Sequence, residues 1–88
     1  MKVKVKVKQK LPKWFRGELY DKGAEVTNRF GGDSCHLNNV ELSMYDFIIG
    51  ATTLMEMGMS QHKTIVDLRK GLDWFRKNNS TAYMILLD

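Results

Sequence analysis

The chain has 88 residues, of which 43% are hydrophobic and 27% charged, and its formal net charge is +4. These values are ordinary for one folded domain over residues 1–88 and exclude a disordered, highly charged tail. A single cysteine excludes an internal disulfide. No secretion signal and no run of the ~20 apolar residues that a membrane span needs are present, so we expect a cytoplasmic protein with no membrane partner.

Basic residues are concentrated at the N-terminus. Residues 1–16 hold seven of the 14 basic residues and no acidic one, so residues 17–88 hold seven basic and ten acidic residues, a net charge of −3. Within residues 1–10 lysine alternates with valine, which predicts a strand with one basic and one apolar face. Two interpretations of residues 1–13 stay open. They are an edge strand whose lysines prevent aggregation, or a basic arm that contacts phosphates or an acidic protein.

Two further strands are predicted after Pro12, which ends the first. Residues Trp14–Tyr20 and Ala24–Phe30 both alternate, and the three residues between them suit a hairpin loop with Gly23 in the left-handed position. In the second of these strands the alternation places Ala24, Val26 and Phe30 toward the core. A second turn at 31–33 then leads to a short strand over 34–37.

The longest periodic apolar run ends at Gly58, whose freedom to adopt a positive φ suits a helix C-terminus. Asn38 and Glu41 have the spacing of a capping box, and Ser43 with Asp46 is a competing start. We favour Asn38 because the apolar stripe already begins at Val40. The stripe of this central helix comprises Val40, Met44, Phe47, Ile48, Ala51, Leu54 and Met55.

A second helix is predicted to run through about Asn78, with Gly71 beside its apolar stripe where another backbone can approach closely. The apolar tail at 81–87 is too short for periodicity to distinguish a strand from a helical turn. We favour a helical turn capped by Asn79 or Ser80. The stripe of the second helix comprises Ile65, Leu68, Leu72 and Phe75.

These elements predict an α+β fold, with an N-terminal antiparallel meander of three or four strands packed against two helices and followed by a short apolar segment. The central helix carries apolar residues on its opposite side as well, so that side is covered either by the rest of the fold or by another subunit. For the second case, a homo-oligomer, the expected interface residues are Leu42, Tyr45, Ile49, Met57 and Trp74.

Several short stretches of the chain carry a resemblance to a known group of proteins: Val26–Gly32, Leu37-Asn38 with Glu41 and Tyr45-Asp46, Trp74–Asn79, and Ala82–Met84 with Leu86–Asp88. Together they resemble small proteins of unknown function from tailed phages that infect marine cyanobacteria. The resemblance implies a phage accessory protein that works in the bacterial cytoplasm. It assigns no functional residue and no cofactor.

The sequence pattern gives little support for a catalytic site or a metal site. Cys35 and His36 are adjacent on a predicted strand and so point to opposite faces, which prevents both from reaching one metal ion with Asp33 or His62. Ser34 and His36 share a face, but local spacing places no orienting carboxylate beside them. We therefore expect a protein that is not an enzyme and needs no metal or cofactor.

Nucleic-acid binding is the alternative to self-association, because the N-terminus mixes lysines with aromatic side chains on which bases can stack. A second basic patch on the back of the second helix combines Lys70, Trp74 and Lys77. The expected function is thus that of a small interaction protein that self-associates, or else sequence-independent nucleic-acid binding. The residues expected to contact nucleic acid are Lys2, Lys4, Lys6, Lys8, Lys10, Lys13, Trp14 and Arg16.

Overall fold

A computed structural model describes residues 9–59 and 61–87 of the chain. Within these residues the fold is α+β and contains a two-stranded antiparallel sheet and three helices. The strand predicted for residues 1–10 lies almost wholly outside the described part, and Gln9 and Lys10 belong to no strand. The elements are β1 (Ala24–Thr27), β2 (Ser34–Leu37), α1 (Asn39–Glu56), α2 (His62–Asn78) and α3 (Ser80–Leu86).

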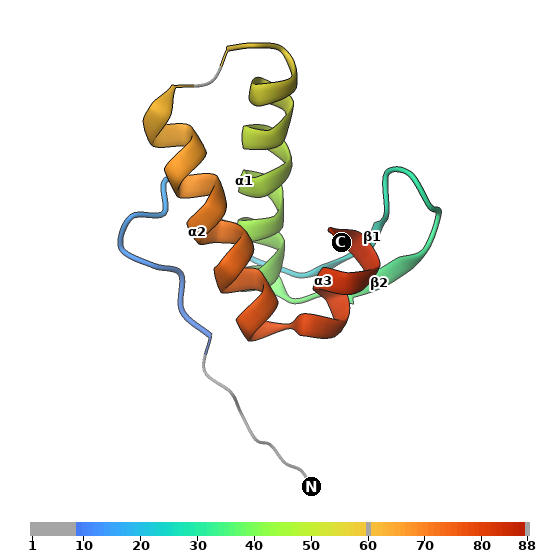
Figure 1. Cartoon of the computed structure of the whole chain (residues 1–88). Coiled ribbons are helices and arrows are strands. Elements are labelled where there is room, and N and C mark those ends of the chain that lie inside the picture. Colours follow the sequence, from blue (N-terminus) through green and yellow to red (C-terminus); the bar gives the residue numbers. More distant parts are fainter. Residues whose placement is uncertain (1–8, 60, 88) are drawn as a thin grey trace, which may run out of the picture.

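Helices α1 and α2 lie side by side and antiparallel, and they form the centre of the molecule (Figure 1). The predicted capping box is confirmed, because the Asn38 side chain accepts from the Glu41 amide at 2.8 Å and the Glu41 carboxylate accepts from the Asn38 amide at 3.0 Å. The competing start is wrong, since the Ser43 hydroxyl donates to the Asn39 carbonyl inside the helix. Gly58 follows the last turn with φ +72°, as predicted.

The core lies where α1, α2 and α3 meet β2. Each of the predicted stripes is buried along only part of its length, with Met44, Ile48 and Phe75 almost fully covered. Gly71 is buried against α1, but the predicted close approach of a backbone is wrong, because the atoms nearest to an added Cβ belong to side chains, with the Met44 sulfur at 3.2 Å. The buried hydrophobic residues are Leu37, Met44, Tyr45, Ile48, Ala51, Leu68, Phe75, Ala82 and Leu86.

The sheet is smaller than the predicted meander. β1 and β2 pair from Ala24 opposite Leu37 to Thr27 opposite Ser34, and β1 therefore ends three residues before Phe30. The pairing stops because the Asn28 side chain accepts hydrogen bonds from the amides of Phe30 and Gly31, which bends the chain into a turn. Hairpin and helices together give an α+β architecture, with two strands in the described part of the chain.

The strand predicted at Trp14–Tyr20 is absent from the structure. The Phe15 amide donates to the Pro12 carbonyl at 3.0 Å, which closes a turn. The rings of Trp14 and Phe15 then both pack on Phe47, with centroids 5.7 and 5.8 Å away. Neighbouring residues of a strand point to opposite faces, so this shared contact excludes an extended strand here. The contacts of both rings with Phe47 therefore determine the conformation of this segment, and the alternating sequence pattern does not.

The predicted hairpin loop before β1 is also wrong, and Gly23 has no positive φ. The absence of a side chain at Gly23 instead allows the chain to pass close to Leu37, because a Cβ at this position would overlap the Leu37 carbonyl oxygen. Residues 9–23 instead wrap around the helix pair and lead into the hairpin on its other side (Figure 1). The Tyr20 amide is fixed on α1 by a 3.0 Å hydrogen bond to the Ser43 hydroxyl.

The apolar tail forms a helix, which confirms the favoured prediction. The Asn79 side chain accepts from the Ala82 amide at 3.1 Å, so Asn79 rather than Ser80 caps α3. Ala82 and Leu86 enter the core beside β2. Among the helices of the described residues, none combines the length and apolar character that crossing a membrane requires.

Candidate interaction surface

The tip of the β1–β2 hairpin is fixed against α3 by Asn28. Its amide oxygen accepts from the Phe30 and Gly31 amides at 2.7 and 3.0 Å, and its amide nitrogen donates to the Ile85 carbonyl at 2.7 Å. Gly32 completes the turn with φ +81°, a conformation that L side chains rarely adopt. The backbone of the hairpin tip, from Asn28 to Gly32, therefore has a well-defined conformation.

Phe30 is the most exposed of the large hydrophobic residues in the described part of the chain, with 87% of its surface open to solvent. The prediction that it points into the core is wrong. Period-two alternation applies only within a strand, and the strand ends at Thr27, so the turn redirects the side chains that follow. Exposure of a whole aromatic ring is unfavourable unless a partner covers it.

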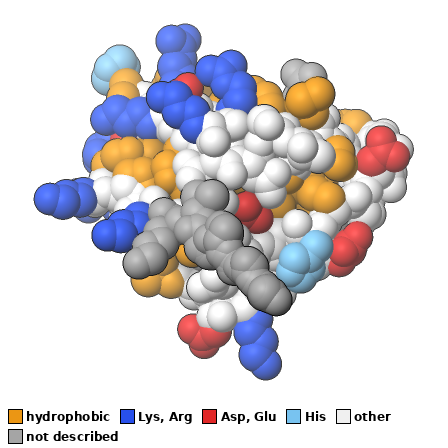
Figure 2. Space-filling model, turned by 90° about the horizontal axis from the view of Figure 1, so that it is seen from below, with side chains coloured by type: hydrophobic (Ala, Val, Ile, Leu, Met, Phe, Trp, Pro, Cys, Tyr) orange, Lys and Arg blue, Asp and Glu red, His pale blue; other side chains and the backbone are white. Residues whose placement is uncertain are grey.

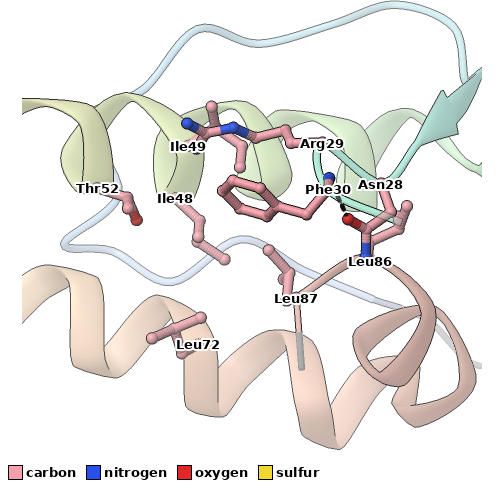
Figure 3. A pocket seen from close by; sticks show the side chains of 9 residues that line it. All are labelled: Asn28, Arg29, Phe30, Ile48, Ile49, Thr52, Leu72, Leu86 and Leu87. Atoms are coloured by element: carbon pink, nitrogen blue, oxygen red, sulfur yellow. Dashed lines mark hydrogen bonds between the residues drawn. The ribbon is translucent and has the colours of Figure 1, made fainter. Parts of the chain in front are cut away.

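A pocket of about 250 Å³ opens beside this ring, between the hairpin tip and the helices. Figure 3 shows side chains from α1, α2 and the end of α3 directed toward the same space, with the Phe30 ring drawn across it. Because that ring is largely exposed, it lies at the mouth rather than inside. The pocket wall is mainly aliphatic. Its lining residues are Asn28, Arg29, Phe30, Ile48, Ile49, Thr52, Leu72, Leu86 and Leu87.

Arg29 lines this pocket, and the opposite charge of Glu56 lies beside Arg29. The Arg29 guanidinium lies 5.3 Å from the centroid of the Phe30 ring, close enough for a cation–π contact. One of its nitrogens lies 3.8 Å from a carboxylate oxygen of Glu56. The distance is long and both side chains are substantially exposed, so this ion pair contributes about 0–1 kcal/mol at most. Both charges thus remain accessible to a partner.

The last turns of α1 present a second set of exposed apolar side chains. Leu54 and Met55, predicted to continue the core stripe, are 40% and 39% exposed, and that part of the prediction is wrong. Met57, one of the expected interface residues, and Met59 are each 62% exposed. Flexible methionine side chains on a surface adapt readily to a partner.

The other expected interface residues lie in different surroundings. Tyr45 belongs to the core, and burial raises the pKa of its hydroxyl. Leu42 and Ile49 are half-buried, and Ile49 lines the pocket. Trp74 is half-buried as well, and its indole N–H donates to the Lys10 carbonyl at 3.0 Å. Much of the second side of α1 is therefore covered by the chain itself.

The residues expected to bind nucleic acid are only partly described, since Lys2, Lys4, Lys6 and Lys8 lie outside the described residues. Lys10, Lys13 and Arg16 are exposed, whereas Trp14 is half-buried in the aromatic cluster on Phe47.

Lys10 joins the second predicted basic patch, because the Trp74 hydrogen bond brings its backbone to the side of α2 that carries Lys70 and Lys77. Lysine and arginine side chains gather along one side of the molecule in Figure 2. Asp73 lies within this patch, 3.2 Å from Lys77, and the two hydrogen bonds from Lys77 and Arg76 lower the pKa of its carboxyl.

Cys35 and His36 point to opposite faces of β2, as predicted. Cys35 is half-buried against the core, and burial, with the charges of Glu25 and Glu41, raises the pKa of its thiol, whereas His36 is exposed. Over residues 9–59 and 61–87, no three His, Cys, Asp or Glu side chains are grouped closely enough to hold a metal ion.

The sequence prediction missed Arg29, Phe30, Glu56 and the pocket between them. The one local feature that indicates this site is the segment from Asn28 to Gly32. In it an asparagine and two glycines, which favour a turn, flank an arginine and a phenylalanine. Searches with this chain match no protein-family model, no curated protein sequence and no solved structure. The site must therefore be interpreted from its own geometry.

Proposed function

We propose that this chain is a small accessory protein without enzymatic activity, which acts by binding and associates with itself. The observation that carries this proposal is the uncovered apolar surface at the hairpin tip and at the end of α1. In a chain this short the core needs most of the apolar residues, so large side chains left in water favour an interaction surface. Phe30, Met57 and Met59 are the most exposed of them in these two places.

The resemblance to proteins of cyanobacterial phages supplies the proposed setting, an accessory role in the cytoplasm of an infected bacterium. The proposal requires no cofactor. Partners of such a protein are a second copy of itself and, for the basic side of α2, an acidic protein or nucleic acid.

Self-association is tested by sedimentation equilibrium of the full chain at about 1 to 100 µM, the range in which interfaces of modest size associate. We expect a concentration-dependent rise in mass above that of the monomer. A single species of monomer mass across the whole range would refute self-association.

Nucleic-acid binding is a second candidate, favoured by the hydrogen bond between Trp74 and Lys10. This contact brings the backbone of Lys10 to the side of α2 that carries Lys70 and Lys77, so basic residues distant in sequence lie near one another. The exposed Lys70 and Lys77 flank Trp74 at helical spacing. Such a surface fits a phosphate backbone without selecting a base sequence.

The test is fluorescence anisotropy with labelled single- and double-stranded DNA at about 50 and 200 mM salt. The variant to compare carries glutamine at Lys2, Lys4, Lys6 and Lys8, and it is preferable to a truncation because Gln9 and Lys10 bond to the folded body. We expect micromolar binding that weakens steeply with salt and falls further in the variant. Binding that neither salt nor the substitutions change would exclude this mode.

A further inference from the structure

We propose that two copies of the chain pair about a twofold axis, with Phe30 of each copy seated in the pocket of the other. The inference rests on the proposed self-association and names the contact that produces it. It follows from the position of an exposed ring and an apolar pocket on one face of the molecule. A surface that carries both a projection and a matching hollow is complementary to itself under a twofold rotation.

The dimensions of the pocket agree with this occupant. An engineered apolar cavity of about 150 Å³ already binds benzene, so a pocket of about 250 Å³ has room for a phenyl ring. Ile48, Ile49 and Leu72 supply an aliphatic wall with which such a ring makes favourable contacts. Thr52 is the polar residue that α1 adds to the lining.

The ring is presented in a defined position before any partner arrives. Asn28 holds the tip with hydrogen bonds to two turn amides and to the Ile85 carbonyl. Little conformational entropy is therefore lost when the ring enters a pocket, which favours association. The Arg29 guanidinium lies over the same ring, 5.3 Å from its centroid.

Charge complementarity supports the same partner. Arg29 at the pocket and Glu56 beside it carry opposite charges, and their contact within one chain is long, at 3.8 Å. Because both charges lie next to Phe30, a twofold contact that exchanges the two rings places Arg29 and Glu56 of each copy at the interface, where each can pair with the opposite charge of the other copy. Opposite charges then face each other twice across the interface, which fixes the relative orientation of the two copies.

The expected dimer is weak. Two aromatic side chains bury about 300–500 Å² in total, and a standard interface buries at least about 1,200 Å². Leu54 and Met55, on the same helix as Glu56, are candidates for the remainder. We therefore expect dissociation constants in the micromolar range rather than the nanomolar range.

The experiment compares the full chain with F30S, T52W and the control M84S by sedimentation equilibrium, with circular dichroism to verify folding. F30S removes the exposed ring. T52W places a large side chain on α1 at the pocket wall and so fills the pocket. M84S changes another strongly exposed apolar side chain, 66% open to solvent against 87% for Phe30, that does not line the pocket. We expect a wild-type dimer, dimerisation at least about tenfold weaker in F30S and T52W, and no change in M84S.

Each other outcome is decisive. A wild-type dimer that F30S and T52W leave intact overturns the Phe30 contact while self-association stands. A wild-type chain that stays monomeric to about 100 µM overturns both proposals, and Phe30 then belongs to a different partner or to its own pocket. A loss of dimer in M84S equal to that in F30S would show that apolar surface in general, not this pocket, drives association.

Discussion

The Asn79 side chain donates a hydrogen bond to the Glu41 carboxylate at 3.0 Å, although 38 residues separate them in the sequence. Each of the two residues also organises the start of a helix, since Glu41 closes the capping box of α1 and Asn79 caps α3. Gln9 donates to the same carboxylate oxygen at 2.8 Å. One buried carboxylate therefore joins the N-terminal segment to the starts of two helices.

Replacement of Glu41 by alanine is expected to lower the free energy of unfolding by about 2–3 kcal/mol. The substitution leaves the donors of Asn38, Gln9 and Asn79 without their acceptor in a region where Glu41 is only 5% exposed. Urea unfolding measures the change. The control is E18A at an exposed position, where we expect a change within about 0.5 kcal/mol. Equal effects in both variants would contradict the role of this hydrogen-bond cluster.

The cap of α3 gives a second comparison. We expect N79A to destabilise the chain by about 1–2 kcal/mol, because it removes both the cap to Ala82 and the donor to Glu41. The neighbouring S80A is expected to be nearly neutral, because Ser80 is exposed and Asn79 already supplies the cap. Thermal unfolding of the two variants distinguishes them, and a larger loss in S80A would show that the cap is assigned to the wrong residue.

Two glycines are expected to respond to alanine in opposite directions. Gly50 lies within α1, exposed, with nothing within 4 Å of an added Cβ, so G50A should stabilise the chain by about 0.5–1 kcal/mol through helix propensity. Gly58 has φ +72°, so G58A should destabilise it by about 1 kcal/mol despite open space around it. The measurement is urea unfolding, and a shift in the same direction for both would contradict the assigned backbone conformations.

Asp73 gives a prediction about pH. Hydrogen bonds from Lys77 and Arg76 lower the pKa of its carboxyl below the ordinary value of 3.8 in the folded state. A lowered pKa stabilises the folded state above the ordinary pKa, and this contribution is lost as the pH falls through the folded-state value. Carboxyl carbon NMR titration measures that value directly. K77A is expected to raise it toward 3.8, and an unchanged titration would show that the contact does not form in solution.

The helices were predictable because their signals are local. Asn38 and Glu41 stand three residues apart, Gly58 directly follows the last turn of α1, and the α2 stripe repeats at helical spacing. The strands were predicted less well, since alternation at Trp14–Tyr20 competed with ring contacts to Phe47, which is distant in the sequence. A local sequence pattern carries no information about contacts between residues that are distant in the sequence.

The pocket depends on similar long-range relationships. It lies where the hydrogen bond from Asn28 to Ile85, 57 residues later in the chain, holds the hairpin tip against the end of α3. Phe30 itself was visible in the sequence, but its direction was not, because the end of β1 is set by a side chain that captures turn amides. The residue types of the site could therefore be read from the sequence, but their positions relative to one another could not.

Gln9 contacts Glu41 and the Asn78 carbonyl, which lies 69 residues further along the chain. During synthesis on a ribosome, α1 can form as soon as its residues emerge, but Glu41 gains its last donor only when Asn79 does. Until then a nascent chain has the hairpin and helix α1 without the elements that cover them. The fold is therefore complete only after Asn79 has been synthesised, and a ribosome stalled before Asn79 would present the apolar side of α1 to chaperones.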